Sequence, residues 1–304
     1  MQGECIIRSA VTYLWKCLIM FSIVFLNIPL LSQSSTAQII NDEYLNVEKI
    51  SERVIIVGSG AYYYTAIIGI KTEKGLVAVD AGISPVMTAR YRKIIEQELG
   101  RDDFIYLINT HGHDDHTSGN QVFSDVPIIA HENCKVDMME FWNDTAKVNK
   151  YVYNEDKRIK AKQSLLESGS DMWKYYESLL QQNYTLKKTL TENFQITYPT
   201  LTFNDRLNLD LGDITLQLIY FGKAHTTSDI MIYVPEEKML FIGDLFGKGG
   251  EPGFEVTNNA DVGRWYEVMD WLFQPDIEIE KVIYGHGLVF TKEDLNSFNN
   301  NIRN

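Results

Sequence analysis

Residues 109–116 are Asn-Thr-His-Gly-His-Asp-Asp-His, and this stretch decides how the rest of the chain is interpreted. It directly follows residues 104–108, Phe-Ile-Tyr-Leu-Ile, a short apolar run that is typical of a buried β-strand. Three of the six histidines in the 304-residue chain lie within these eight positions. The polar cluster therefore begins where a strand ends, which is where layered α/β folds place their functional side chains.

The spacing of these side chains suits metal binding. His111 and His113 are two positions apart, so a looped backbone can direct both rings toward one point. Asp115 and His116 can reach a second point a few ångströms away. Imidazole and carboxylate groups bind zinc, manganese or iron, and two such ions about 3.5–4 Å apart form a hydrolytic centre. A solvated polar loop also contains His, Asp and Gly, but it would not collect half of the chain's histidines.

The pattern His-x-His-x-Asp-His resembles the signature of the metallo-β-lactamase superfamily. The other motifs of that family are present in order: a strand that ends in Asp80, Gly222-Lys223-Ala224-His225-Thr226, Phe241-Ile242-Gly243-Asp244 and Tyr284-Gly285-His286-Gly287. The resemblance extends over roughly residues 45–290 and is specific for the superfamily and its fold. It does not specify a substrate.

The order of the predicted elements indicates an α/β fold. Strands are predicted at 53–57, 62–70, 75–79, 104–109, 127–130, 214–221, 230–234, 239–242 and 281–284, and helices at 85–99 and 261–273. Every candidate ligand follows a strand, and helical sequence separates the strand groups. This arrangement predicts two sheets face to face with helices outside, a four-layer αβ/βα sandwich, the metallo-β-lactamase fold, in one domain at 38–304.

Residues 133–195 differ from their surroundings, because they are polar and show the helical spacing of amphipathic helices. We expect two or more helices inserted between the second and third motifs. They form either a packing element on the outer layer or a cover over the metal cleft that shapes the substrate pocket. Cys134, at the start of this insertion, is interpreted as a buried structural cysteine, and His131, just before it, as a polar residue at a strand end.

The resemblance implies a dinuclear site. His111, His113 and His225 would hold the first metal ion, and Asp115, His116 and His286 the second. Asp244 would bridge the two ions. Asp115 and Asp244 are therefore also candidate catalytic residues. Asp80 would support the histidine loop by accepting hydrogen bonds, although a simple turn aspartate remains an alternative. Two zinc ions are expected, with manganese or iron as alternatives, and the nucleophile would be a metal-bound hydroxide.

The residue at position 244 separates branches of the family. The best-known secreted lactamases have Cys at this point, whereas Asp is typical of hydrolases that are not lactamases. We therefore expect a hydrolase of a small ester, lactone, thioester or amide. The alternatives are a β-lactamase that hydrolyses β-lactam antibiotics and a binding protein with a dead site. The intact set of ligands argues against a dead site.

The ends of the chain and its charge indicate where it acts. Residues 1–37 contain basic residues, a fifteen-residue apolar stretch from Cys17 to Leu31 and a small-residue cleavage site before Gln38, which predicts a secretory signal. The protein is expected to be periplasmic or extracellular, with membrane contact only if the signal is retained as an anchor. The net charge of −13 argues against nucleic acid as a partner, so a small-molecule substrate is expected.

Overall fold

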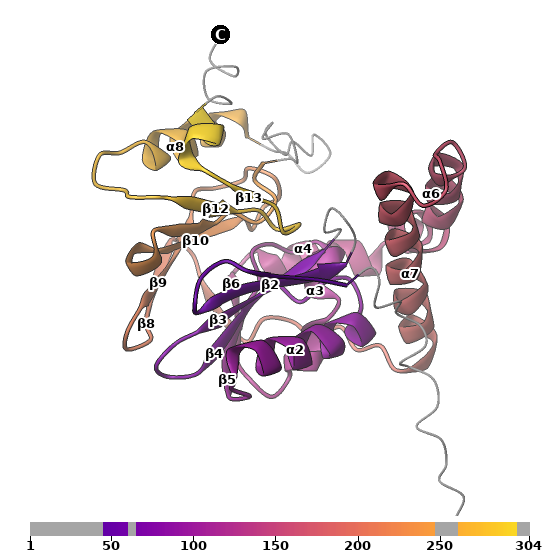
Figure 1. Cartoon of the computed structure of the whole chain (residues 1–304), viewed down its shortest axis with the longest axis horizontal. Coiled ribbons are helices and arrows are strands. Elements are labelled where there is room, and N and C mark those ends of the chain that lie inside the picture. The colour runs from indigo at the N-terminus through magenta and orange to yellow at the C-terminus, as the bar shows by residue number, and fades with distance from the viewer. Residues whose placement is uncertain (1–44, 60–64, 247–260, 297–304) are drawn as a thin grey trace, which may run out of the picture. The chain divides into compact units, whose positions relative to one another are not determined.

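The computed structural model describes residues 45–59, 65–246 and 261–296, which form two β-sheets with helices beside them (Figure 1). The predicted signal at 1–37 lies outside these ranges, and so does the start of the predicted mature chain. The domain boundary at 37/38 therefore stays a prediction. A search of the described helices finds none with the length and apolar character that crossing a membrane requires.

The first sheet has seven strands, arranged in space in the order of the sequence. They are β1 (Leu45–Lys49), β2 (Val54–Ser59), β3 (Ala66–Lys71), β4 (Leu76–Val79), β5 (Phe104–Ile108), β6 (Ile128–His131) and β7 (Leu201–Phe203). Neighbours from β1 to β4 are antiparallel, and neighbours from β4 to β7 are parallel. Every residue of β2 and of β4 is buried, as expected for strands that are covered on both faces.

The second sheet has six strands from the C-terminal half, in the spatial order β13-β12-β11-β10-β9-β8. They are β8 (Arg206–Asp210), β9 (Thr215–Tyr220), β10 (Ile230–Val234), β11 (Met239–Phe241), β12 (Lys281–Ile283) and β13 (Val289–Phe290). A single 3₁₀ turn, η4 (Pro235–Glu237), connects β10 to β11, between the strands predicted at 230–234 and 239–242. β13 was not predicted, because two residues are too few to show a strand pattern.

The two sheets pack face to face through one apolar core, to which Ile68 of β3 and Leu218 of β9 both contribute. On the outer side of the first sheet lies α2 (Pro85–Leu99), which matches the helix predicted at 85–99. It begins with proline, and Gly100, which follows it, has the left-handed conformation. On the outer side of the second sheet lies α8 (Val262–Leu272). The order helix, sheet, sheet, helix confirms the predicted αβ/βα sandwich (Figure 1).

The predicted helical insertion is present between β6 and β7. It consists of α4 (Cys134–Asn143), α5 (Thr145–Val148), the π-helical turn η3 (Asn149–Tyr153), α6 (Glu155–Gln163) and α7 (Asp171–Glu192). α7 packs against α2 (Figure 1). The buried side of α7 is largely polar and includes Gln182 and Asn183, whereas the aromatic residues Trp173 and Tyr176 are half-buried.

The carboxyl ends of five strands lie at one edge of the two sheets and position the candidate ligands. β4 and β5 are parallel neighbours, as are β11 and β12, and β9 runs in the same direction as β11 because both are antiparallel to β10. Each of these strands is followed within five residues by one of the candidate side chains: Asp80, His111, His225, Asp244 and His286. The folding of both sheets therefore brings residues more than 200 positions apart into one site.

Candidate metal centre

The loop after β5 is held in place before its histidines begin. Asn109 and Asn120 exchange two side-chain hydrogen bonds of 3.0 and 2.9 Å, and both residues are fully buried. The short helix α3 (Asp114–Thr117) then begins after His113. Gly112 lies so close to α4 that a Cβ atom there would come within 2.5 Å of the Cβ of Asp137. Glycine at this position therefore allows the histidine loop to pack directly on the insertion.

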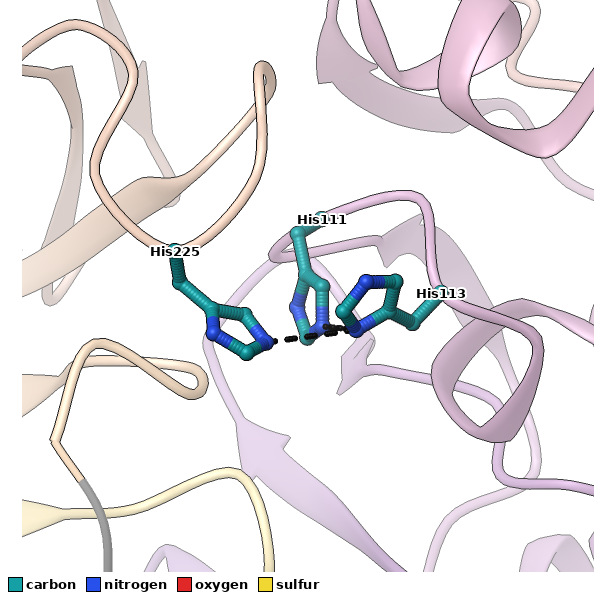
Figure 2. Close-up of side chains that lie close together, drawn as sticks. All are labelled: His111, His113 and His225. Atoms are coloured by element: carbon teal, nitrogen blue, oxygen red, sulfur yellow. Dashed lines mark hydrogen bonds between the residues drawn. The ribbon is translucent and has the colours of Figure 1, made fainter. Parts of the chain in front are cut away.

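Three imidazoles converge at the end of this loop, as Figure 2 shows. His111 Nε2 is 3.1 Å from His113 Nδ1, and His225 Nε2 is 3.2 Å from the same atom. Three nitrogens bound to a tetrahedral zinc ion at about 2.0–2.1 Å lie about 3.3 Å from one another, close to these distances. The structure thus brings together the three side chains that were predicted to hold the first metal ion.

Protons alone cannot satisfy these contacts. Thr110 Oγ1 donates to Asp80 at 2.8 Å, so it accepts from His111 Nδ1 at 3.0 Å, and His111 Nε2 keeps its lone pair. A single proton on His113 Nδ1 cannot form full hydrogen bonds to both His111 Nε2 and His225 Nε2. Burial lowers the pKa of His113 to about 3 and holds that of His111 well below its usual value, so no second proton is retained at neutral pH. A cation among the three nitrogens satisfies all of them, and the residues fit a metal ion.

Asp115, His116 and His286 form a second set, with ligand atoms within 4.8 Å of one another. His116 Nδ1 donates to Asp80 Oδ2 at 2.9 Å, and its buried Nε2 has no hydrogen-bond partner among the described residues. Burial lowers the pKa of His116, but three surrounding carboxylates outweigh it and raise the pKa well above its usual value. This second position therefore favours a positive charge, which a bound cation supplies in place of the proton.

Asp244 lies between the two sets. Its Oδ2 is 2.7 Å from His286 Nε2, and its Oδ1 is 3.5 Å from His116 Nε2. Ligand atoms of Asp244, His111 and His116 also lie within 4.8 Å of one another. Within the described ranges, Oδ1 is buried without a hydrogen-bond partner. Burial alone would raise the pKa of Asp244, but His286 and His116 outweigh it and hold the pKa well below its usual value. This position supports the bridging role, which stays a prediction, as do the ligand roles of the other six residues.

Asp80 connects the two sets through hydrogen bonds with His116 and with Thr110, whose hydroxyl group contacts His111. Its fully buried carboxylate accepts from Thr110 N at 2.8 Å and from Thr110 Oγ1, and it orients His116. The backbone of Asp80 is left-handed, with φ of 58°, a conformation that Asp tolerates better than most residues. The predicted supporting role of Asp80 is thus confirmed, because the carboxylate fixes both the histidine loop and one ring.

Asp80→Ala is expected to weaken binding of the second metal ion by about 10–100-fold, because outer partners of metal-ligating histidines contribute to affinity on this scale. Asp80→Asn should lose less, since it keeps one acceptor oxygen and tolerates the left-handed backbone. Competition for zinc with a chromophoric chelator measures the affinity for each of the two ions. Asp276→Ala, which removes an exposed carboxylate, is the control. Unchanged affinity for both ions in Asp80→Ala would contradict the orienting role.

His131 is not part of the centre. Its ring stacks on Tyr220, with the ring centroids 3.6 Å apart. Its Nδ1 accepts from Asn133 N at 3.2 Å, and its Nε2 is 3.2 Å from Asn204 O. Both ring nitrogens therefore have backbone partners, and the interpretation of His131 as a strand-end residue without a ligand role is confirmed.

Cys134 is buried, and burial raises the pKa of its thiol well above the usual value. The structural role predicted for it is consistent with this position. Although Cys134 is separated from the histidine motif in the sequence, it lies beside this loop in space, because its carbonyl oxygen would be 2.9 Å from a Cβ atom at Gly112. Distance along the sequence did not show that α4 packs beneath the histidine loop.

Asp229 was missed by the sequence interpretation. Its buried carboxylate accepts from Thr226 N at 2.6 Å, Thr226 Oγ1 at 2.8 Å and Ala224 N at 3.3 Å. It thereby closes the loop that carries His225 onto itself. The spacing Thr226-x-x-Asp229 directly before a strand was a usable signal, because short polar side chains often fold a turn by bonding to nearby backbone groups.

The insertion was expected to be either a packing element or a cover over the metal cleft. Its first helix, α4, packs against the histidine loop at Gly112, which supports a packing role for this helix. A cover formed by the later helices stays a prediction.

A family model for the metallo-beta-lactamase superfamily matches residues 62–286. Two curated proteins named metallo-beta-lactamase type 2 are similar to the chain. That of Bacteroides fragilis is 28% identical over 108 residues, which are 35% of this chain and 43% of that protein. That of Elizabethkingia meningoseptica is 24% identical over 114 residues, 37% and 46% of the two chains. The chain thus spans less than half the length of these curated relatives.

Solved structures show the same fold. A metallo-beta-lactamase from Pontibacter korlensis has a TM-score of 0.56 at 20% identity, covering 84% of this chain and 97% of its own. DIM-1 metallo-beta-lactamase has a TM-score of 0.53 at 18% identity, covering 84% of this chain and 95% of its own. A double mutant of the sec-alkyl sulfatase PisA1 has a TM-score of 0.59 at 14% identity, covering 84% of this chain and 40% of its own. Because the family model matches well over half of the sequence, the chain belongs to the metallo-beta-lactamase superfamily, a family of metal-dependent hydrolases.

Proposed function

We propose that this protein is an exported, dinuclear metal-dependent hydrolase that acts on a small ester, lactone, thioester or amide. The observation that carries the proposal is the convergence of two ligand sets around Asp244, in which buried atoms of His116 and Asp244 lack hydrogen-bond partners among the described residues. Bound dications supply Lewis acidity and turn water into a nucleophile at neutral pH. Zinc is proposed as the metal because buried imidazoles dominate the first set.

The residues of the chain prepare the centre for this chemistry. Burial keeps His111 and His113 neutral, so the first set leaves the charge of its cation uncompensated. The second set contains the carboxylate of Asp115, and the carboxylate of Asp244 lies between the two sets. A cation held by the three neutral imidazoles would therefore keep more of its charge than one held beside the carboxylates, and it would be the stronger electrophile for attack on a carbonyl.

β-Lactam hydrolysis is the second candidate function, and one observation favours it. Both curated relatives are named metallo-beta-lactamases. Against it stands Asp244, at the position where the best-known secreted lactamases of the family have Cys. A binding protein with a dead site is less well supported, because all seven predicted ligand residues are present and gathered at one edge of the sheets.

Purified without chelator, the protein is expected to contain close to two metal ions per chain by elemental analysis. Removal of the ions should abolish hydrolysis, and zinc should restore it. A panel of esters, lactones, thioesters, amides and β-lactams then identifies the substrate class. One ion or none after reconstitution would contradict the dinuclear centre. A kcat/KM for penicillins or carbapenems above about 10⁵ M⁻¹s⁻¹, within the usual range for an enzyme on its own substrate, would establish the lactamase alternative instead.

Export is proposed from residues 1–37 alone, since their charge, apolar stretch and small-residue cleavage site are typical of a secretory signal. A centre that needs metal is compatible with a periplasmic or extracellular location. The proposal predicts that protein recovered from its native compartment begins at or near Gln38.

A further inference from the structure

The first helix of the insertion contacts the loop that carries His225. Asn133 is the residue directly before α4, and Asp137 lies one helical turn later on the same side. The carboxylate of Asp137 accepts hydrogen bonds from the hydroxyl groups of Thr227 and Ser228, and Asn133 Nδ2 donates to Thr227 O at 2.8 Å. Neither residue belongs to a motif of the family signature. Together they attach the loop after β9 to the insertion.

The same turn of α4 also supports the loop that carries His111 and His113. Gly112, between these two histidines, would place a Cβ atom 2.5 Å from the Cβ of Asp137 and 2.9 Å from Cys134 O. One short stretch of helix therefore touches both segments that supply the three-imidazole set. The distance between His225 and the other two histidines depends on how each loop sits on this helix.

The His225 loop is attached as a unit. Asp229 closes residues 224–226 onto themselves through three hydrogen bonds, so the loop is internally stiff. Thr227 and Ser228 then connect this stiff loop to Asp137, while Tyr220 OH adds one further bond to Thr227 O at 3.0 Å. Loss of the Asp137 carboxylate would remove two hydrogen bonds to a charged acceptor, which are stronger than bonds between neutral groups. The loop, and His225 with it, would then shift without unfolding.

We propose that Asp137 is a positioning residue that sets the distance between His225 and the pair His111 and His113, and thereby the affinity and geometry of the three-imidazole metal position. The inference rests on the metal centre proposed above. It assigns to the first helix of the insertion a role in positioning the loops of the metal centre. It also predicts that the three-imidazole position depends more strongly on Asp137 than the second position does, because the hydrogen bonds of Asp137 go to the loop that carries His225.

The test is metal binding by Asp137→Ala, measured as competition of zinc with a chromophoric chelator for both ions. Asp137→Ala is expected to bind one of the two ions about tenfold more weakly, at the lower end of the range for outer partners, and the other ion as the wild type does. Asp137→Asn keeps one acceptor oxygen and should recover part of the loss. Cobalt absorption bands of the singly loaded protein should change in Asp137→Ala, because they report the geometry of the imidazole site.

Glu140→Ala is the matched control, since Glu140 is an exposed carboxylate on the same helix, and it should bind both ions normally. Thermal melting of each metal-free variant separates a local shift from loss of folding. Wild-type affinities and an unchanged cobalt spectrum in Asp137→Ala would overturn the inference. Equally weakened binding of both ions, together with a lower Tm of the metal-free variant, would also overturn the inference, since that pattern indicates general destabilisation. A wild-type protein that binds no metal would instead overturn the proposed function.

Discussion

Asp244→Ala is expected to release one of the two metal ions and to lower kcat by about 10²–10³-fold, the usual loss on removal of one positioned electrostatic group. The carboxylate is only 9% exposed, contacts His286 at 2.7 Å and reaches toward His116 at 3.5 Å. Its removal leaves a gap between the two ligand sets and takes away a negative charge that lies within 4.8 Å of ligand atoms of both His111 and His116. Elemental analysis and steady-state kinetics on the substrate found by the panel measure the two effects.

Two further variants make this result specific. Asp244→Cys should retain more metal and more activity than Asp244→Ala, because a thiolate can still bind the second ion. Asp276→Ala removes an exposed carboxylate and should behave as the wild type. If Asp244→Ala keeps two ions and near-normal turnover, the bridging role is wrong, whatever the identity of the substrate.

The positions of the seven candidate ligands could be predicted because each follows an apolar run. A strand such as β5 is visible in the sequence as Phe-Ile-Tyr-Leu-Ile, and the polar residues directly after it mark a sheet edge. The order of the motifs then indicates which edges meet. The family resemblance predicted that Asp80 supports the histidine loop, but residue spacing alone could not show this role, since its partners are 30 and 36 positions away.

Asp137 shows why some of the site remained hidden. On a polar helix, a lone Asp one turn after Asn has the same pattern as a solvated face, and only the packing of α4 beneath Gly112 distinguishes the two. The buried polar side of α7 was missed for a similar reason. Gln182 is fully buried there and accepts from Thr65 Oγ1 at 3.2 Å, a tertiary contact that residue spacing does not predict.

Gly285→Ala is expected to weaken binding of the second metal ion strongly. It should also destabilise the fold by about 1–3 kcal/mol, the usual cost of forcing extra volume into a packed site. A Cβ atom at this position would lie 2.4 Å from Asp244 Oδ1 and 2.8 Å from His116 Cε1. Neither side chain can move away freely, because Asp244 is held by His286 and the ring of His116 by Asp80. The loop itself is tied to the neighbouring strand end by the bond from Gly285 N to Gly243 O at 2.8 Å.

The backbone of Gly285 is not left-handed, so the effect of alanine comes from crowding and not from φ. Gly263→Ala is the matched control, because this glycine is exposed on α8 and a Cβ atom there would meet only the Asp261 carboxylate, at 3.1 Å. Zinc competition and thermal melting with and without metal distinguish a damaged site from a damaged core. The predicted pattern is a large loss of metal-dependent stabilisation in Gly285→Ala with a modest change in the metal-free Tm. Full stabilisation by zinc in Gly285→Ala would mean that Asp244 and His116 do not bind the ion in the positions found here.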